Sequence, residues 1–264
     1  MSITLHYDGL VARITLDRPD KLNAFDDALI EDIIRAVSEA GNSDARVIVL
    51  AGAGKHFSAG GDLNWMRRMA DMSWEENRAD AARLAALMST LDRAPKPVIT
   101  RVQGAAYGGA TGLACASDIT LAADNARFCL SEVRIGLLPA VISPYVVRAI
   151  GARQARRYFM TAEVIDARRA VQIGMAHEAV PESELDATVD KCVDALLSGA
   201  PAAQIKSRTL IERVAHQPAS DELIAWTAEL IAGLRSTEEG REGLDAFLGK
   251  RPPAWQPAAK GDAS

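Results

Sequence analysis

The stretch PVITRVQGAAYGGATGLACASDITLAAD, residues 97–124, contains the pattern that decides the fold. An apolar run leads into a glycine-rich turn, a short helix-like segment and a second apolar run, which is the order strand, turn, helix, strand. Residues 46–69, RVIVLAGAGKHFSAGGDLNWMRRM, follow the same plan, and their first run is typical of a strand buried on both faces. Two such units in succession predict one α/β domain.

The sequence on either side extends this domain. Residues 3–16 alternate between apolar and polar around Asp8-Gly9, which predicts a hairpin, and residues 25–40 repeat apolar residues at helical spacing. After residue 145 the pattern is almost wholly helical.

Three segments are expected from these patterns. The core should span residues 1–200 and a helical region residues 201–257, whereas the Pro/Ala/Gly-rich end, 258–264, is expected to be disordered.

Composition excludes several classes of protein. The 264 residues carry a net charge of −5 and are 48% hydrophobic, which is ordinary for a soluble domain and gives no support for a nucleic-acid partner. No apolar run is long enough for a membrane helix, and the first residues do not resemble a signal peptide. The cysteines lack CxxC spacing and the histidines are scattered, so we expect buried thiols, no metal site and a cytoplasmic protein.

The two glycine turns carry the strongest chemical signal. A strand that ends in glycine and opens a helix leaves free backbone N–H groups at the positive end of the helix dipole. Two such turns that converge could hold an oxyanion, and glycine removes the Cβ that would block approach. The alternative is that both are only tight turns. Motifs of nucleotide-binding loops fail here, since Tyr107 stands where GxGxxG needs glycine and Lys55 is not followed by Ser or Thr.

Among the acidic residues, Glu132 is a lone carboxylate between the apolar runs FCLS and IGLL. Burial there would raise its pKa and suit it to proton transfer near neutral pH. The alternative is an exposed residue at a strand end, as most glutamates are.

Together these segments resemble the crotonase superfamily, also called the enoyl-CoA hydratase/isomerase family. The resemblance covers residues 1 to about 257 and rests on five segments in the family's order: RPDKLNAFD, HFSAGGDLNWM, VQGAAYGGATGLACASDITLAADNARF, SEVRIGLLPA and STEEGREGLDAFLGKRPP. Residues 136–163 are similar to the bacterial 3-methylglutaconyl-CoA hydratase branch and its isohexenylglutaconyl-CoA sister branch.

The resemblance implies a ββα-spiral core, a C-terminal helical trimerisation region, and trimers or dimers of trimers. It implies an acyl-CoA thioester as substrate, with no separate cofactor. Gly61 and Gly109 would donate the oxyanion-hole N–H groups, and Glu132 would handle the proton at C2. Residues matched to CoA or substrate binding are Lys21, Ala24, Ala59, Asp62, Leu63, Tyr107, Phe247 and Lys250.

One position departs from the family's hydratases. Their second catalytic glutamate belongs at position 112, where this chain has Gly112. The absence leaves the acid–base work to Glu132, removes repulsion against a substrate carboxylate, and is expected to make room for a β-methyl or longer branch. Arg67, Arg68 and Asn64 are candidate partners for that distal carboxylate.

Three functions stay open from the sequence. The first is hydration of the 2,3 double bond of a branched, carboxylated enoyl-CoA, in leucine/isovalerate or acyclic terpene catabolism. The second is a Δ3-Δ2-enoyl-CoA isomerase that shuttles a proton between C2 and C4 on the same glutamate. The third, from another class, is a non-catalytic protein that binds CoA thioesters or nucleic acid.

Overall fold

The computed structural model describes residues 2–215 and 217–257. It divides into two compact units after Lys191, within helix α7 (Leu185–Ser198). The sequence places this boundary near residue 200, just before α8 begins at Pro201. The predicted disordered tail, 258–264, lies outside the described residues.

A six-stranded sheet forms the centre of the first unit, in the spatial order β1-β2-β3-β4-β6-β9. Its strands are β1 (Ile3–Asp8), β2 (Val11–Leu16), β3 (Val47–Gly52), β4 (Val98–Val102), β6 (Ile119–Ala123) and β9 (Glu178–Val180). The predicted N-terminal hairpin is confirmed by the antiparallel pairing of β1 with β2, and every other neighbouring pair is parallel. Together with the helices, this sheet confirms the α/β class.

A second, three-stranded sheet lies beside the first and consists of β5 (Ala105–Tyr107), β7 (Arg127–Cys129) and β8 (Ile165–Asp166). The apolar run 97–106 reads as one strand in the sequence, but the structure divides it between β4 and β5. The reason lies at Gly104, whose φ is +57° and where an added Cβ would overlap the carbonyl oxygen of Lys55. Only glycine fits there, and the chain uses it to pass from one sheet to the other.

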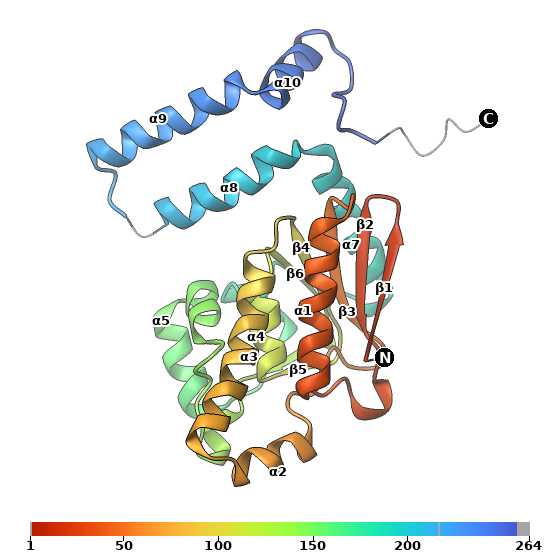
Figure 1. Cartoon of the computed structure of the whole chain (residues 1–264), viewed down its shortest axis with the longest axis vertical. Coiled ribbons are helices and arrows are strands. Elements are labelled where there is room, and N and C mark those ends of the chain that lie inside the picture. The colour runs from red at the N-terminus through yellow and green to blue at the C-terminus, as the bar shows by residue number, and fades with distance from the viewer. Residues whose placement is uncertain (1, 216, 258–264) are drawn as a thin grey trace, which may run out of the picture. The chain divides into compact units, whose positions relative to one another are not determined.

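Helices of the first unit cover the main sheet, with α1 and α3 side by side on one face (Figure 1). The helices are α1 (Asp27–Asn42), α2 (Leu63–Asp71), α3 (Trp74–Asp92), α4 (Gly109–Ala116), α5 (Ser143–Thr161) and α6 (Ala167–Gln172). Three short 3₁₀ helices complete it: η1 (Pro19–Lys21), η2 (Glu132–Ile135) and η3 (Glu182–Glu184). The apolar stripe of α1 packs into the core, where Leu29, Ile30 and Ile33 have no exposed surface.

The second unit is helical, as predicted for this part of the chain, and contains α8 (Pro201–Val214), α9 (Asp221–Ser236) and α10 (Glu238–Leu248). Several large apolar side chains of these helices are exposed, with Phe247 at 81% and Leu248 at 76% of their surface. In the described part of the chain, no helix is both long enough and apolar enough to span a bilayer.

Candidate active site

The two glycine turns of the sequence lie next to each other because the strands before them are neighbours. β3 pairs in parallel with β4, with Ile48 opposite Val98, so both strands end at the same edge of the sheet. Beyond that edge, Ser58 forms a parallel bridge with Ala106. The N–H of Ser58 donates to the carbonyl of Ala105 over 2.9 Å, and the N–H of Tyr107 donates to the carbonyl of Ser58 over 3.1 Å.

The backbone N–H of Gly61 is left outside this pairing. Gly61 forms a second parallel bridge, with Phe25, but its two hydrogen bonds use the N–H groups of Phe25 and Asp62, at 2.7 and 2.8 Å. In a parallel pair, the residue between two such bonds directs its own N–H away from the partner strand. Gly61 is also exposed, so a ligand can approach its backbone.

Gly109 presents a second N–H nearby. It is the first residue of α4, and N–H groups in the first turn of a helix have no partner within the helix. The turn before it needs glycine, since Gly108 has a φ of +54°. A Cβ added at Gly109 would lie 3.9 Å from the ring of Phe25, the residue that pairs with Gly61. Phe25 therefore contacts both glycines that are matched to the oxyanion hole.

Glu132 is the acidic group at this turn. Its Oε1 lies 3.4 Å from the position of an added Cβ on Gly108, so its carboxylate faces the start of α4. Its Oε2 is buried and has no hydrogen-bond partner among the described residues. Burial raises the pKa of Glu132, and the carboxylate's bond to its own backbone N–H offsets this only in part. A buried carboxylate oxygen without a partner is unusual in native proteins and marks a candidate for proton transfer.

The expected space at Gly112 is absent. A Cβ added there would overlap Cγ2 of Ile142 and lie 2.8 Å from its Cβ and 3.2 Å from Sδ of Met88. Ile142 is 2% exposed and Met88 has no exposed surface, so both belong to the packed core. The prediction that the missing carboxylate makes room for a substrate branch is therefore wrong at this position. An isoleucine fills that volume because protein interiors pack without voids.

Several residues matched to CoA binding lie around Gly61. The segments 21–25 and 59–62 run together, since the N–H of Ala59 donates to the carbonyl of Leu22 over 3.0 Å. Lys21 and Leu63 are exposed, Ala24 is buried and Ala59 half-buried.

Asp62 caps α2 by accepting from the N–H groups of Asn64 and Trp65. Partial burial would raise the pKa of Asp62, but these two hydrogen bonds, with Lys21 and Arg18 nearby, hold it below its ordinary value.

The remaining matched residues are divided between the two units. Tyr107 is the last residue of β5, directly before Gly108, and is half-buried. Phe247 lies near the end of α10, and Lys250 follows that helix with a φ of +51°. Both belong to the second unit, and their part in CoA binding stays a prediction.

Sequence reasoning missed two side chains that shape this site. Phe25 lies in RPDKLNAFD and Ile142 two residues after SEVRIGLLPA, but nothing in their local pattern shows that one contacts both glycines and the other fills the space at Gly112. Histidine, cysteine, aspartate and glutamate side chains form no group of three suited to a metal ion within residues 2–215 and 217–257.

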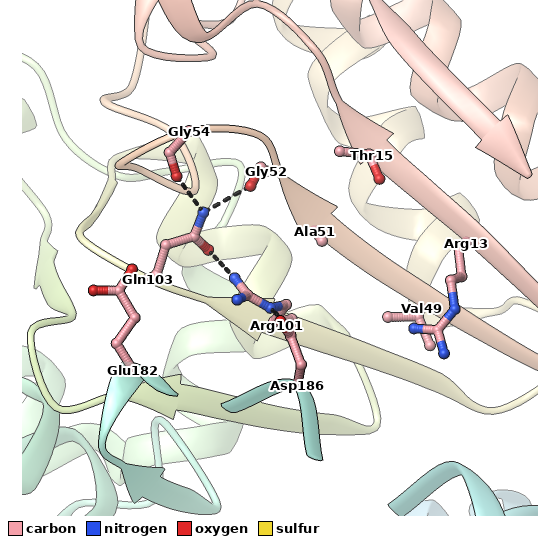
Figure 2. A pocket seen from close by; sticks show the side chains of 10 residues that line it. All are labelled: Arg13, Thr15, Val49, Ala51, Gly52, Gly54, Arg101, Gln103, Glu182 and Asp186. Atoms are coloured by element: carbon pink, nitrogen blue, oxygen red, sulfur yellow. Dashed lines mark hydrogen bonds and ion pairs between the residues drawn. The ribbon is translucent and has the colours of Figure 1, made fainter. Parts of the chain in front are cut away.

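A cavity of about 310 Å³, lined by residues of β2, β3, β4 and the segment 182–186, is a poorer candidate for the reactive site. Arg101, Gln103 and Asp186 of its lining are joined by hydrogen bonds, as the dashed lines in Figure 2 show. Arg101 donates to Asp186 over 2.6 Å and to Gln103 over 2.8 Å, and Gln103 donates to the carbonyls of Gly52 and Gly54. Glu132, in contrast, keeps an oxygen free, which favours the glycine turns as the reactive site.

Substitution of Gly112 tests the packing at that position. Gly112→Ala is expected to destabilise the protein by about 1–3 kcal/mol in urea denaturation, because the new methyl group collides with Ile142. The double variant Gly112→Ala/Ile142→Val should recover part of the loss. Gly233→Ala on α9 is the control, since nothing lies within 4 Å of an added Cβ there. Equal stability of the two alanine variants would contradict the packing described.

The raised pKa of Glu132 predicts how stability depends on pH. Between its ordinary value of 4.5 and its folded value, the folded chain holds a proton that the unfolded chain has lost. The wild-type protein should therefore lose stability relative to Glu132→Gln as pH rises from 4.5 through the folded pKa, and no further above it. Thermal melts of both proteins between pH 4 and 8 measure the difference. The exposed-site control is Glu31→Gln on α1, whose stability difference from the wild type should not follow this pH trend. A stability difference between the wild type and Glu132→Gln that does not change with pH would disprove a raised pKa of Glu132.

Comparison with known proteins places the whole chain in one family. Residues 7–258 match the model of the family described as Enoyl-CoA hydratase/isomerase. A short-chain-enoyl-CoA hydratase of Clostridium acetobutylicum is 32% identical over 95% of both chains. A trans-2-decenoyl-[acyl-carrier-protein] isomerase of Streptococcus mutans is 32% identical over 96% of this chain and 97% of its own.

Among solved structures, an enoyl-CoA hydratase from Shewanella pealeana is 47% identical and superposes with a TM-score of 0.93, covering 97% of this chain and 96% of its own. This agreement confirms the crotonase-like α/β fold with its C-terminal helices. The chain belongs to the enoyl-CoA hydratase/isomerase family.

Proposed function

We propose that this protein adds water across the 2,3 double bond of a branched enoyl-CoA that carries a distal carboxylate. The observation that carries the proposal is the buried Oε2 of Glu132, which has no partner among the described residues and belongs to a carboxylate that faces the start of α4. A free carboxylate with a raised pKa can take and return a proton near neutral pH. Two backbone donors can stabilise negative charge on a thioester oxygen.

The proposed reaction uses one acid–base group. Glu132, ionised, removes a proton from water while the water oxygen bonds to C3 and the C2–C3 double bond opens. The electron pair moves onto the thioester oxygen, where Gly61 and Gly109 donate hydrogen bonds to the enolate. Glu132 then returns its proton to C2, the enolate collapses, and the site is restored. The product is a 3-hydroxyacyl-CoA with the proton and hydroxyl of a single water.

Two residues of α2 support recognition of a distal carboxylate. Arg68 donates to Asp27 over 2.6 Å, so its charge is balanced by an acid. Arg67 donates to the neutral amide oxygen of Asn64 over 2.7 Å, and both side chains are exposed. The charge of Arg67 is not balanced by that bond, and the pair Arg67–Asn64 is the better candidate to bind an anionic group.

Isomerisation is the second candidate, and the packing at Gly112 favours it as much as hydration. Because Ile142 fills the space at Gly112, that position supplies no second carboxylate, and we assign the proton transfer to Glu132 alone. One glutamate suffices to move a proton between C4 and C2 of an enoyl-CoA. The Streptococcus mutans relative, named as an isomerase, is as similar to this chain as the Clostridium hydratase.

Isotopic labelling separates the candidates. A panel of 2-enoyl- and 3-enoyl-CoA thioesters that includes 3-methylglutaconyl-CoA should be incubated with the protein in H₂¹⁸O and in D₂O. We expect ¹⁸O at C3 and the highest kcat/KM with the branched, carboxylated substrate. Deuterium incorporation and double-bond migration without ¹⁸O from any 2-enoyl-CoA would replace hydration by isomerisation.

Replacement of Glu132 tests whether the protein is an enzyme of either kind. Glu132→Gln should lower kcat by about 10²–10⁴-fold, the usual range for a general acid–base residue. The control Glu31→Gln, exposed on α1, should keep wild-type activity. A Glu132→Gln variant with unchanged function would instead favour a protein that only binds CoA thioesters. Assembly as trimers or dimers of trimers and a cytoplasmic location stay predictions.

A further inference from the structure

Helix α2 follows directly after Gly61, yet very little of the helix is buried. Of its nine residues, all of which the structure describes, Trp65 is the only fully buried one, at 6% exposure. Its neighbours Asn64, Arg67 and Arg68 are exposed. The indole of Trp65 is therefore the main apolar anchor that holds α2 against the core.

One edge of this indole packs on Gly61. A Cβ added at Gly61 would lie 3.5 Å from Cε3 of Trp65, at ordinary van der Waals distance, with the side chain of Met66 beside it at 3.4 Å. On its other side, the backbone of Gly61 pairs with Phe25. Any shift of the indole would therefore move the Gly61 peptide relative to Phe25 and to the start of α4.

The indole N–H is tied to a buried acid on the next helix. Nε1 of Trp65 donates to Oδ1 of Asp80 on α3 over 3.1 Å, and Asp80 is only 3% exposed. Arg83 donates to the same oxygen over 2.9 Å and balances its charge. A buried carboxylate that accepts two hydrogen bonds and faces a cation is held firmly, so it gives the indole a fixed partner.

Arg83 also links Asp80 to the segment that pairs with Gly61. Nη2 of Arg83 lies 3.9 Å from Oδ1 of Asp27, the first residue of α1, and Arg68 of α2 donates to Oδ2 of Asp27. Leu84, next to Arg83, lies 3.9 Å from the position of a Cβ on Gly109. Helix α3 thus contacts the start of α1, which follows the segment paired with Gly61, and also lies against Gly109.

We propose that Trp65 is a positioning residue of the oxyanion hole, whose indole, hydrogen-bonded to Asp80, sets the Gly61 N–H relative to that of Gly109. The inference rests on the proposed function, since it gives Gly61 a reacting oxygen to bind. Donors of this kind must lie about 2.7–3.1 Å from the developing oxyanion. A displacement of about 1 Å can lower a rate by about 100-fold.

Trp65→Phe is the first test, because it keeps an aromatic ring and removes only the N–H and the second ring. We expect kcat to fall about tenfold on the best enoyl-CoA substrate while KM changes less than about twofold, since charge on the oxygen develops in the transition state. The matched control is Trp74→Phe, a tryptophan of α3 that is 70% exposed, which should leave both constants unchanged. Wild-type kcat in Trp65→Phe would overturn the proposal.

Asp80→Leu tests the other end of the contact. It should lower kcat about as much as Trp65→Phe does, and the double variant should lose no more than either single variant, because all three remove the same hydrogen bond. A kcat of the double variant that is reduced by the product of the two single-variant factors would contradict a shared contact. If Asp80→Leu did not fold, Trp65→Phe would still decide the proposal.

An infrared measurement on a bound, unreactive acyl-CoA tests the same proposal without any catalytic turnover. The ¹³C-labelled carbonyl of a bound saturated acyl-CoA should absorb at lower frequency on the wild-type protein than in water, because two N–H groups polarise it. In Trp65→Phe the band should move back toward the free value. A role in stability alone would lower the melting temperature and leave the band in place, which would overturn the proposal.

The band also separates this inference from the proposed function. A wild-type protein that shifts the carbonyl band but converts no enoyl-CoA would disprove hydration and isomerisation, while the Trp65→Phe band would still decide the role of Trp65. A wild-type protein that binds acyl-CoA without any shift would overturn both.

Discussion

The parallel pairing of β3 with β4 is the constraint on which the rest of the site depends. Parallel strands end at the same edge of a sheet, so turns that follow two neighbouring strands must meet there. This brings Gly61 and Gly109 together although they are far apart in the sequence. The backbone itself supplies both N–H groups, so the donors need no side-chain rotamer to be ordered before a ligand arrives.

Close packing also limits which side chains this site can contain. Glu132 keeps one oxygen without a partner, which costs free energy in a folded protein and persists where function uses it. On α4, Gly112 is covered by Ile142 and Met88, so no side chain can be added at that position without repacking. The site thus combines the unpartnered Oε2 of Glu132 with a filled core at position 112, and that position offers no room for a second carboxylate.

Much of the fold could be predicted from residue patterns because the patterns are local. Apolar runs and glycine turns located β3, β4 and the start of the site, and helical spacing located α1. The division between β4 and β5 was missed, because a contact between Gly104 and the backbone of Lys55 decides it and these residues are distant in sequence. Glu132 stood out by its apolar neighbours, but its unpartnered oxygen depends on what surrounds it in space.

The same reason explains which site residues were not foreseen. Trp65 lies in a quoted segment, yet its bond to Asp80 joins two helices and leaves no periodic signal. The absence of a carboxylate at Gly112 was visible in the sequence, whereas its replacement by Ile142 was not, because the two positions come together only through the packing of α4 against the start of α5.

The contact between Gly112 and Ile142 also restricts how this chain can change over generations. A single mutation to glutamate at position 112 would place a long, charged side chain where isoleucine already lies, and the encoded protein would fold poorly before it gained any new chemistry. A smaller residue at 142 has to come first, and it opens an apolar void that carries its own loss of stability. A glutamate at position 112 thus needs a second change at position 142, and the packing of the core itself opposes the substitution.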